Sequence, residues 1–182
     1  MNYFELIRKY IPYNSRTYPI YVIHVSLVTA KALQIARQKN LSRIQIQFIE
    51  EAGMLHDIGI CRVHAPSLGC NGNRPYLWHG VAGRKILEKE NLPRHALVAE
   101  RHVGLGLTKQ EIIQQRLPLP QRDMLPESIA EKIICWADLF FSKRRNRLWE
   151  EKSFAQVRTE VSKYGKRQSD LLQHWKHYFA ER

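Results

Sequence analysis

Apolar residues recur along most of the chain with the spacing of amphipathic helices, and alternating strand patterns are scarce. In a helix predicted over about 19–39, apolar positions follow one another at intervals of 3, 4 and 3 residues: Ile20, Ile23, Leu27 and Ala30. A helix predicted to begin near Ser42, a good N-cap residue, repeats this spacing: Ile46, Ile49, Gly53 and His56. The pattern predicts an all-α protein.

Further helices are predicted over 2–10, 77–90, 93–102, 108–115, 126–143 and from 153 to near the end. Thr108 and Glu111 have the spacing of a capping box. The helix that begins near Ser42 is expected to end at Gly59. Residues 60–76 are rich in turn formers and are predicted to form an irregular loop of the kind that covers or binds ligands. The Pro-rich stretch 117–128 is predicted to be a rigid connector that packs on the surface.

The length of 182 residues and the absence of a linker or internal repeat indicate one domain over 1–182. We expect its core to lie at about 19–145, with a C-terminal helix at about 153–182 packed on it. No apolar run is expected to reach the roughly 18 residues of a membrane span. The N-terminus lacks the features of a signal peptide. We therefore expect a soluble, cytoplasmic protein without a membrane partner.

The chain is strongly basic, with 29 Lys and Arg against 17 Asp and Glu and a formal net charge of +12. Such a charge attracts polyanions or phosphorylated small molecules, although a basic solvated surface explains it equally well. Much of the excess lies at 143–147 and in the C-terminal third. A dedicated nucleic-acid-binding protein is disfavoured, because we find no binding motif and no regular interleaving of aromatic and basic residues. Oligomeric state is left open.

Three cysteines in a chain without an export signal indicate reduced thiols rather than a disulfide framework. A zinc site built from Cys61, His64 and Cys70 is a weaker alternative, because the spacing is unusual and a fourth ligand is missing.

Six residues of metal-ligand type lie on or beside apolar helical faces: His24, His56, Asp57, His79, His102 and Asp138. The long intervals between them suit ligands that come from several helices of a bundle and point to a common centre. Such nitrogen and oxygen ligands suit divalent iron, manganese, nickel, zinc or magnesium. Each residue alone has a structural explanation, but burying all of them without a partner is costly, so a shared metal is the better explanation.

His24, the pair His56-Asp57 and Asp138, in this order, resemble the signature of the HD-domain metal-dependent phosphohydrolase superfamily. The letters HDIG at 56–59 match the form that names a large subgroup. The stretches HGVAG, AERHVGLGLT, LPLPQRDMLPES and EKIICWADLFFSK are similar to those of uncharacterised bacterial and archaeal HDIG proteins. The resemblance covers about residues 20–145 and implies a single-domain HD-domain helical bundle.

The resemblance also implies a distribution of the ligands over two divalent metals per chain. His24, His56 and Asp138 would hold the first metal, His79 and His102 the second, and Asp57 would bridge them. Small residues at Ala82 and Gly83 would let the helix that carries His79 approach the centre closely.

Two metals can activate a water and hold a phosphoryl oxygen, which suits hydrolysis of phosphate esters or anhydrides. We expect a small phosphorylated substrate, a nucleotide in the first instance. The expected catalytic residues are His56, Asp57, Arg62 and His64. The expected substrate contacts, for which plain surface charge is an alternative, are Arg62, His64, Arg74, Lys143 and Arg144. Two other functions stay open: an HD-fold di-iron oxygenase, and a non-catalytic metal- or nucleotide-binding module.

Overall fold

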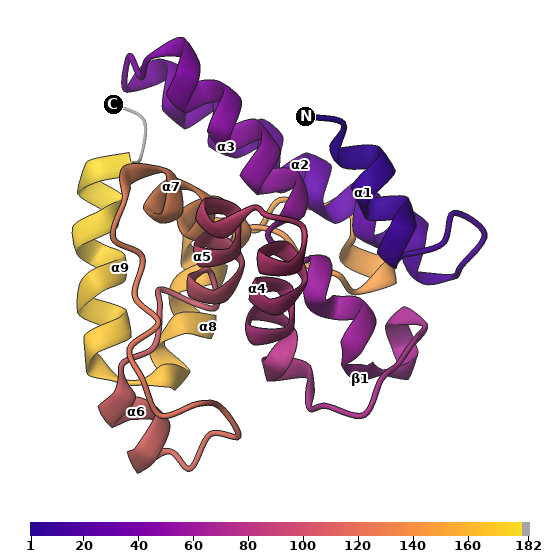
Figure 1. Cartoon of the computed structure of the whole chain (residues 1–182). Coiled ribbons are helices and arrows are strands. Elements are labelled where there is room, and N and C mark those ends of the chain that lie inside the picture. The colour runs from indigo at the N-terminus through magenta and orange to yellow at the C-terminus, as the bar shows by residue number, and fades with distance from the viewer. Residues whose placement is uncertain (180–182) are drawn as a thin grey trace.

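Helices dominate the computed structural model, which describes residues 1–179 (Figure 1). The all-α fold class predicted from the sequence is confirmed. The α-helices of the described residues are α1 (Tyr3–Tyr10), α2 (Thr17–Gln38), α3 (Arg43–Leu55), α4 (His79–Lys89), α5 (Pro93–Arg101), α6 (Lys109–Gln114), α7 (Ile129–Asp138), α8 (Phe154–Val161) and α9 (Lys166–Phe179).

Helices α2 and α3 form an antiparallel pair, and α7 packs across α2. The predicted N-cap at Ser42 is present, because its hydroxyl accepts a hydrogen bond from the Gln45 backbone N–H and the Gln45 side chain returns one. Gly53 lets the pair approach closely, since a Cβ at this position would lie 2.6 Å from Thr29 Oγ1. The predicted ligands His24, His56 and Asp138 lie in these three helices or directly after them.

Gly59 has a different role from the predicted one. Helix α3 ends earlier, at Leu55, and Gly59 lies inside a 3₁₀ turn, η1 (Ile58–Arg62). Its φ angle is not positive, so it is not needed to reverse the chain. A Cβ there would lie 2.0 Å from the backbone oxygen of His79, which shows that Gly59 is required for close packing of η1 against α4.

Residues 60–76 are more regular than predicted. Two short antiparallel strands, β1 (His64–Ala65) and β2 (Cys70–Asn71), enclose the 3₁₀ turn η2 (Pro66–Leu68). A further turn, η3 (Tyr76–Trp78), leads directly into α4. The stretch is therefore a small hairpin held by backbone hydrogen bonds, not an irregular loop.

Helices α4 and α5 pack closely against each other near the middle of the molecule (Figure 1). Gly83 allows this approach, because a Cβ there would lie 3.1 Å from the Ala99 Cβ. The pairing brings the start of α4, at His79, next to the residue that follows α5, His102.

Helix α7 is shorter than the predicted 126–143. It begins after its N-cap Ser128 and ends at Asp138, so Lys143 lies in the non-helical segment that follows. The Pro-rich connector before α7 packs on the molecule as predicted, with Leu119 and Met124 buried against Val81.

The region from 153 onward is not one helix. Gly165 adopts a φ of 108°, a conformation that ordinary residues avoid, and separates α8 from α9. Helix α9 packs on the helical core through Leu172, Trp175 and Phe179.

Helix α2 is long and apolar enough to span a membrane by length and composition, which corrects the expectation that no such run exists. Half of its most apolar window is buried inside the protein, where α2 packs against α3 and α7. This placement is that of a core helix.

Two apolar clusters make up most of the core. One joins α2 and α3 to α7, α8 and α9, and the other joins α1, α2, η1, the hairpin, α4 and α5. Val25 belongs to the second cluster and Val28 to the first, so α2 passes through both. The predicted ligand His24 precedes both residues on α2, close to the point where the helix passes from one cluster to the other.

Candidate metal centre

The six predicted ligands come together, and most of them lie at helix ends. His24 lies within α2, whereas His56 and Asp57 follow α3, His79 begins α4, His102 follows α5 and Asp138 ends α7. His24, His56 and Asp57 are fully buried. Helix ends place these side chains at one point, because the five segments meet there from different directions.

His24, His56 and Asp138 form one set. The Nε2 atom of His24 lies 3.0 Å from Asp138 Oδ1, and the Nε2 atom of His56 lies 3.5 Å from the same oxygen. All three ligand atoms lie within 4.8 Å of one another, so one ion could contact all of them.

His79 and His102 form a second set. Their Nε2 atoms lie 3.1 Å apart, and they lie 3.5 Å and 3.6 Å, respectively, from Asp57 Oδ1. The other oxygen of Asp57, Oδ2, lies 3.5 Å from His24 Nε2. Asp57 thus stands between the two sets and faces each with a different oxygen.

The orientation of the rings fits a metal. His56, His79 and His102 each place Nδ1 within 2.8 Å of the backbone oxygen three residues earlier. A carbonyl only accepts hydrogen bonds, so each Nδ1 carries the proton and each Nε2 presents a lone pair to the centre. The close Nε2 atoms of His79 and His102 then face each other as two acceptors, an arrangement that a cation between them would stabilise.

Several buried atoms of the centre make no hydrogen bond, although one of them, Asp57 Oδ2, is ion-paired with Lys143: Nδ1 and Nε2 of His24, Nε2 of His56, both oxygens of Asp57 and Oδ1 of Asp138. Unpaired buried polar atoms are rare because leaving each one unpaired costs roughly 1–3 kcal/mol. Their convergence matches the donor set of a divalent ion, so the residues present fit the implied metals.

Burial keeps most of the histidines neutral. It lowers the pKa of His24 to about 4, and the charge of Lys143 acts in the same direction. Burial, with His56 and His79 nearby, lowers the pKa of His102 to about 3, and burial also lowers the pKa of His79. His56 differs: burial acts to lower its pKa, but contact with Asp138 and the charge of Asp57 outweigh it and raise the pKa.

The two carboxylates are ionised. Burial acts to raise the pKa of Asp57 and of Asp138, but the charge of Lys143 and the adjacent histidines hold both pKa values well below the usual range. Ionised carboxylates and mainly neutral imidazoles are the protonation states that bind a metal.

Lys143 is the predicted substrate contact that reaches the centre. Its Nζ lies 2.7 Å from Asp57 Oδ2, and its side chain is 12% exposed. Tyr76, which the sequence analysis did not single out, interacts with Lys143, and its ring centroid lies 4.9 Å from that of His79. The sequence signal for Tyr76 was an aromatic residue three positions before a ligand histidine. Aromatic residues in turns are too common for this signal to be specific.

The other predicted substrate residues lie on the surface. Arg62, His64, Arg74 and Arg144 are exposed, and no contact recorded within residues 1–179 joins them to the six ligands. His64 belongs to the hairpin, and the Arg74 guanidinium lies 4.6 Å from the Trp78 ring centroid. Their predicted roles in catalysis or substrate binding stay predictions.

The cysteine alternative gains no support. The thiol of Cys61 donates to the Ile58 backbone oxygen, and the thiol of Cys70 lies 3.6 Å from Thr17 Oγ1. Burial raises the pKa of Cys61 to about 11, which keeps this thiol protonated and unsuited to zinc. Across residues 1–179, no cysteine joins a group of potential metal ligands.

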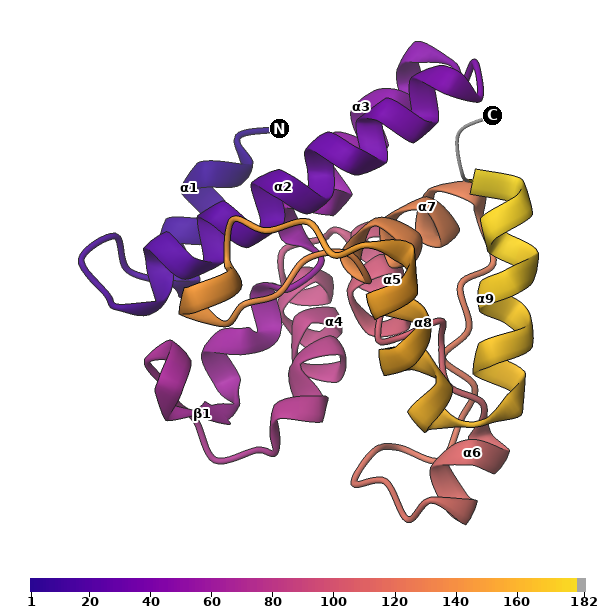
Figure 2. The same ribbon diagram turned by 180° about the vertical axis from the view of Figure 1, so that it is seen from behind.

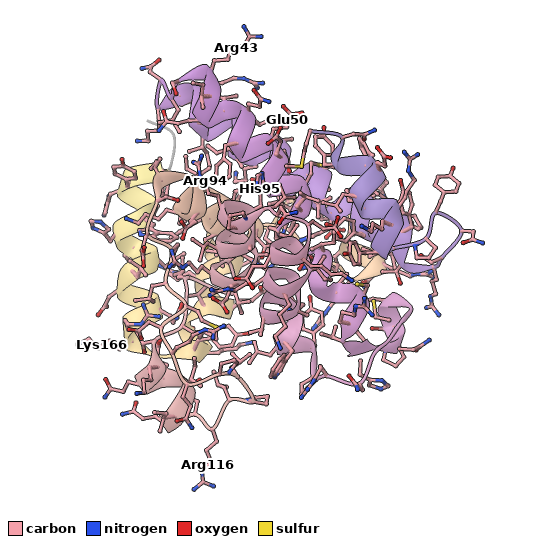
Figure 3. All side chains as sticks on the ribbon, in the orientation of Figure 1. Arg43, Glu50, Arg94, His95, Arg116 and Lys166 are labelled. Carbon is pink, nitrogen blue, oxygen red and sulfur yellow. The ribbon has the colours of Figure 1, made fainter. Side chains whose placement is uncertain are left out.

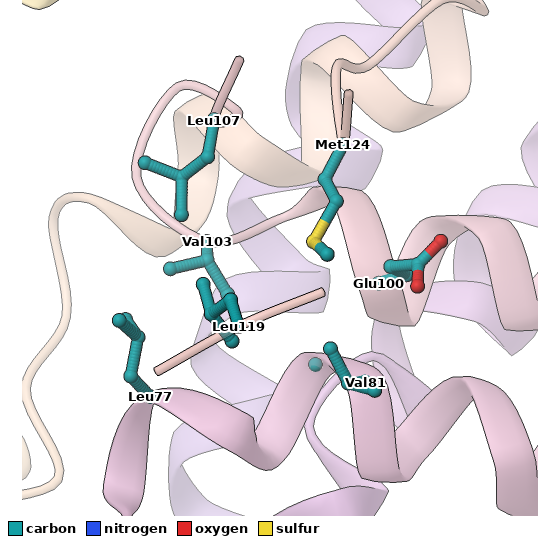
Figure 4. A pocket seen from close by; sticks show the side chains of 8 residues that line it. Leu77, Val81, Glu100, Val103, Leu107, Leu119 and Met124 are labelled. Atoms are coloured by element: carbon teal, nitrogen blue, oxygen red, sulfur yellow. The ribbon is translucent and has the colours of Figure 1, made fainter. Parts of the chain in front are cut away.

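A narrow apolar cleft lies beside the second histidine set, between α4, the end of α5 and the connector (Figure 4). Leu77, Val81 and Met124 are among its lining residues, and it has no room for a water molecule. Glu100 at its edge is bound by Arg84 and Arg122. The cleft is therefore a packing feature and not a second ligand site.

Comparison with known families gives a match over residues 21–141 to the family described as HD domain. This range contains all six predicted ligands and makes up more than half of the chain.

The chain is also similar to three curated proteins. An uncharacterized protein of Methanocaldococcus jannaschii is 36% identical over 118 residues, which are 64% of this chain and 62% of that protein. A tRNA (cytidine(56)-2'-O)-methyltransferase of Picrophilus torridus is 32% identical over 80% of this chain and 40% of its own length. The protein of the same name from Thermoplasma volcanium is 32% identical over 65% of this chain and 31% of its own length. The chain thus spans less than two thirds of each relative.

Among solved structures, the HD domain of the L. monocytogenes phosphodiesterase PgpH, in complex with cyclic-di-AMP, has a similar fold. The TM-score is 0.54 with 16% identity, and the match covers 97% of this chain and 98% of the other. At this identity the likeness concerns the fold alone.

Proposed function

The chain belongs to the HD-domain family of metal-dependent phosphohydrolases, and from this premise we propose that it hydrolyses a phosphate ester or anhydride of a nucleotide. The observation that carries the proposal is the convergence, around Asp57, of buried ligand atoms that make no hydrogen bond, with the ammonium group of Lys143 ion-paired to one oxygen of Asp57. This combination suits an anionic substrate that binds at a metal.

In the proposed centre, His24, His56 and Asp138 would hold one divalent ion, His79 and His102 would hold a second, and Asp57 would serve both. Such ions, when bound, acidify a water and stabilise charge on a phosphoryl group. Iron, manganese, nickel, zinc and magnesium are all compatible with this donor set.

The chain's own residues contribute orientation and charge. The backbone oxygens behind His56, His79 and His102 fix the rings so that Nε2 faces the centre. Lys143 supplies a cation for a phosphate oxygen, and Tyr76 helps to hold it in place.

A nucleotide is supported by the PgpH HD domain, whose structure is a complex with cyclic-di-AMP. The net charge of +12 also favours a phosphorylated ligand. A second candidate is a phosphate within RNA or an RNA fragment, and two relatives named as tRNA methyltransferases, of which this chain matches a part, favour it.

The proposal is tested with purified protein whose metal content is measured by mass spectrometry. The metal-loaded chain is offered nucleoside mono- and triphosphates, cyclic dinucleotides, dinucleoside polyphosphates and phosphorylated RNA oligonucleotides, and cleavage is followed by chromatography. We expect turnover of at least one class. His56→Ala should abolish it, whereas His174→Ala, at an exposed position on α9, should not.

The same assay separates the alternatives. Consumption of dioxygen by the iron-loaded protein would show that the chain is an oxygenase and not a hydrolase. A chain that takes up no metal and cleaves nothing would be a binding module, and the proposal would then be wrong.

A further inference from the structure

The segment that links α7 to α8 carries a basic run that the proposed centre uses only in part. Lys143 points inward to Asp57, whereas the next basic residues, Arg144, Arg145 and Arg147, are exposed. The segment therefore begins at the metal centre and continues on the surface.

The segment that links α7 to α8 is held in place by a buried side chain and by backbone hydrogen bonds. Leu148 is buried in the same apolar cluster as the hairpin residues Val63 and Leu68. The backbone N–H of Arg147 donates to Arg144, and that of Lys152 donates to Phe140. The turn η4 (Arg145–Arg147) lies beside α2 on the hairpin side of the molecule (Figure 2).

The exposed charges of the segment are largely uncompensated. Within residues 1–179, no ion pair involves the guanidinium of Arg144 or Arg145, and Arg147 pairs with Glu150 at 3.5 Å in an exposed position, where such a pair contributes little. The neighbouring acidic residue Glu151 is already bound by Lys31.

Trp149 adds an aromatic surface to this charge. It is 71% exposed, and no ring or cation contact of its indole is recorded within residues 1–179. Its neighbours in the sequence are the buried Leu148 and the charged Glu150, so the segment itself presents one exposed apolar side chain and not the apolar helical face that inserts into a membrane.

We propose that Arg144, Arg145, Arg147 and Trp149, here called the 144–149 surface, bind single-stranded RNA and guide it to the metal centre. Arginines contact phosphates, and an exposed indole stacks on bases of any sequence, the combination typical of single-strand binding. The choice of RNA rests on the second candidate substrate of the proposed function, which is a phosphate within RNA. This inference departs from the expectation that nucleic acid is disfavoured as a partner, because three arginines and one aromatic residue do not form a motif recognisable in the sequence.

The test is fluorescence anisotropy with a labelled single-stranded RNA oligonucleotide and the full chain, in the presence of a chelator so that no cleavage occurs. Trp149→Ala should weaken binding roughly 5- to 100-fold, since one stacked base is lost. Arg144→Ala with Arg145→Ala should weaken binding and reduce the slope of log K against log salt by about 1.4, at roughly 0.7 per phosphate contact.

A matched control removes the same charge elsewhere. Arg43 lies at the start of α3 and Arg116 lies just beyond α6, each projecting from a different end of the molecule (Figure 3). The double variant Arg43→Ala, Arg116→Ala should bind RNA almost as the wild type does. Equal losses in both double variants, or an unchanged affinity of Trp149→Ala, would overturn the inference.

The outcome is independent of hydrolysis. RNA binding that depends on the 144–149 surface, in a chain without phosphohydrolase activity, would support this inference and contradict the proposed function. Cleavage of small nucleotides without measurable RNA binding would do the reverse.

Discussion

The two halves of the proposed metal centre are built differently. The set of His24, His56 and Asp138 contains a carboxylate of its own, with an oxygen 3.0 Å from His24 Nε2. The set of His79 and His102 has no carboxylate of its own and shares Asp57, whose Oδ1 lies 3.5 Å and 3.6 Å from the two rings.

The rings of the second set are the more firmly oriented. Both His79 and His102 donate Nδ1–H to a backbone oxygen, whereas Nδ1 of His24 has no hydrogen-bond partner. Lower negative charge should make the second position the weaker one for a divalent ion, and fixed rings should keep its geometry when it is empty. The comparison therefore predicts stepwise loading, with the second ion lost first.

The largest effect is expected from removing the residue that both sets share. Asp57→Ala should lose all bound metal and reduce activity by at least roughly 1000-fold, because both positions lose their common anion. The isosteric Asp57→Asn separates loss of charge from loss of shape, and circular dichroism shows whether each variant folds. Asp170→Ala, exposed on α9, is the matched control. A metal-replete, active Asp57→Ala would refute the assignment of the centre.

The next effect distinguishes the two sets. His79→Ala should lower metal content from about two toward one ion per chain, and so should His102→Ala, whereas His24→Ala should lower the occupancy of the stronger position. Mass spectrometry after dialysis against a graded chelator series measures this. Unchanged stoichiometry in His79→Ala would place the protein among the mononuclear members of its family.

The convergence of the six residues was predictable because side chains on buried faces of helices leave a periodic signal. His24 and His56 lie on such faces, and both are fully buried. Asp138 ends its helix, and Lys143 follows in a non-helical segment that the sequence placed inside that helix. The close approach at Gly59 could not be predicted, because it depends on the backbone of α4, which is distant in sequence.

A third prediction concerns the cation beside the shared carboxylate. Lys143→Met keeps most of the side-chain volume and removes the charge, so it should raise KM for a phosphorylated substrate by roughly 10- to 100-fold, the loss expected for a charged hydrogen bond. Metal content should stay at the wild-type level, because Lys143 is not a ligand. Lys152→Met, whose ammonium pairs with Glu160 away from the centre, is the control. A normal KM in Lys143→Met would exclude the phosphate contact.

The pH dependence of the metal-free protein provides a fourth prediction. His24 and His102 have folded-state pKa values of about 4 and 3, below the ordinary value of 6.5 that they regain on unfolding. The unfolded chain then binds more protons below pH 6.5, so stability should fall as the pH drops from about 6.5 toward 4. The lowered pKa of His79 adds to this effect and the raised pKa of His56 offsets part of it, which leaves an expected loss of about 2–4 kcal/mol by pH 5.

Urea unfolding of the chelator-treated protein at pH 7.5 and pH 5 measures this loss. Saturating metal should make the loss larger, because protons compete with the ion for the same nitrogens. Metal-free stability that is equal at both pH values would show that the histidines are not held neutral by burial.

The smallest effect is expected at Tyr76, whose phenol interacts with Lys143 while its ring lies against His79. Tyr76→Phe keeps the ring and removes the hydroxyl, so it tests only the hold on Lys143. If the hydroxyl positions this ammonium for a phosphate, KM should rise about 3- to 10-fold, as for the loss of one hydrogen bond of modest net strength, with kcat and metal content unchanged. In a Lys143→Met background the same substitution should have no further effect, because the group that it positions is gone. An equal loss in both backgrounds would mean that Tyr76 acts through His79 and the second metal position instead, and loss of one ion per chain in Tyr76→Phe would establish that directly.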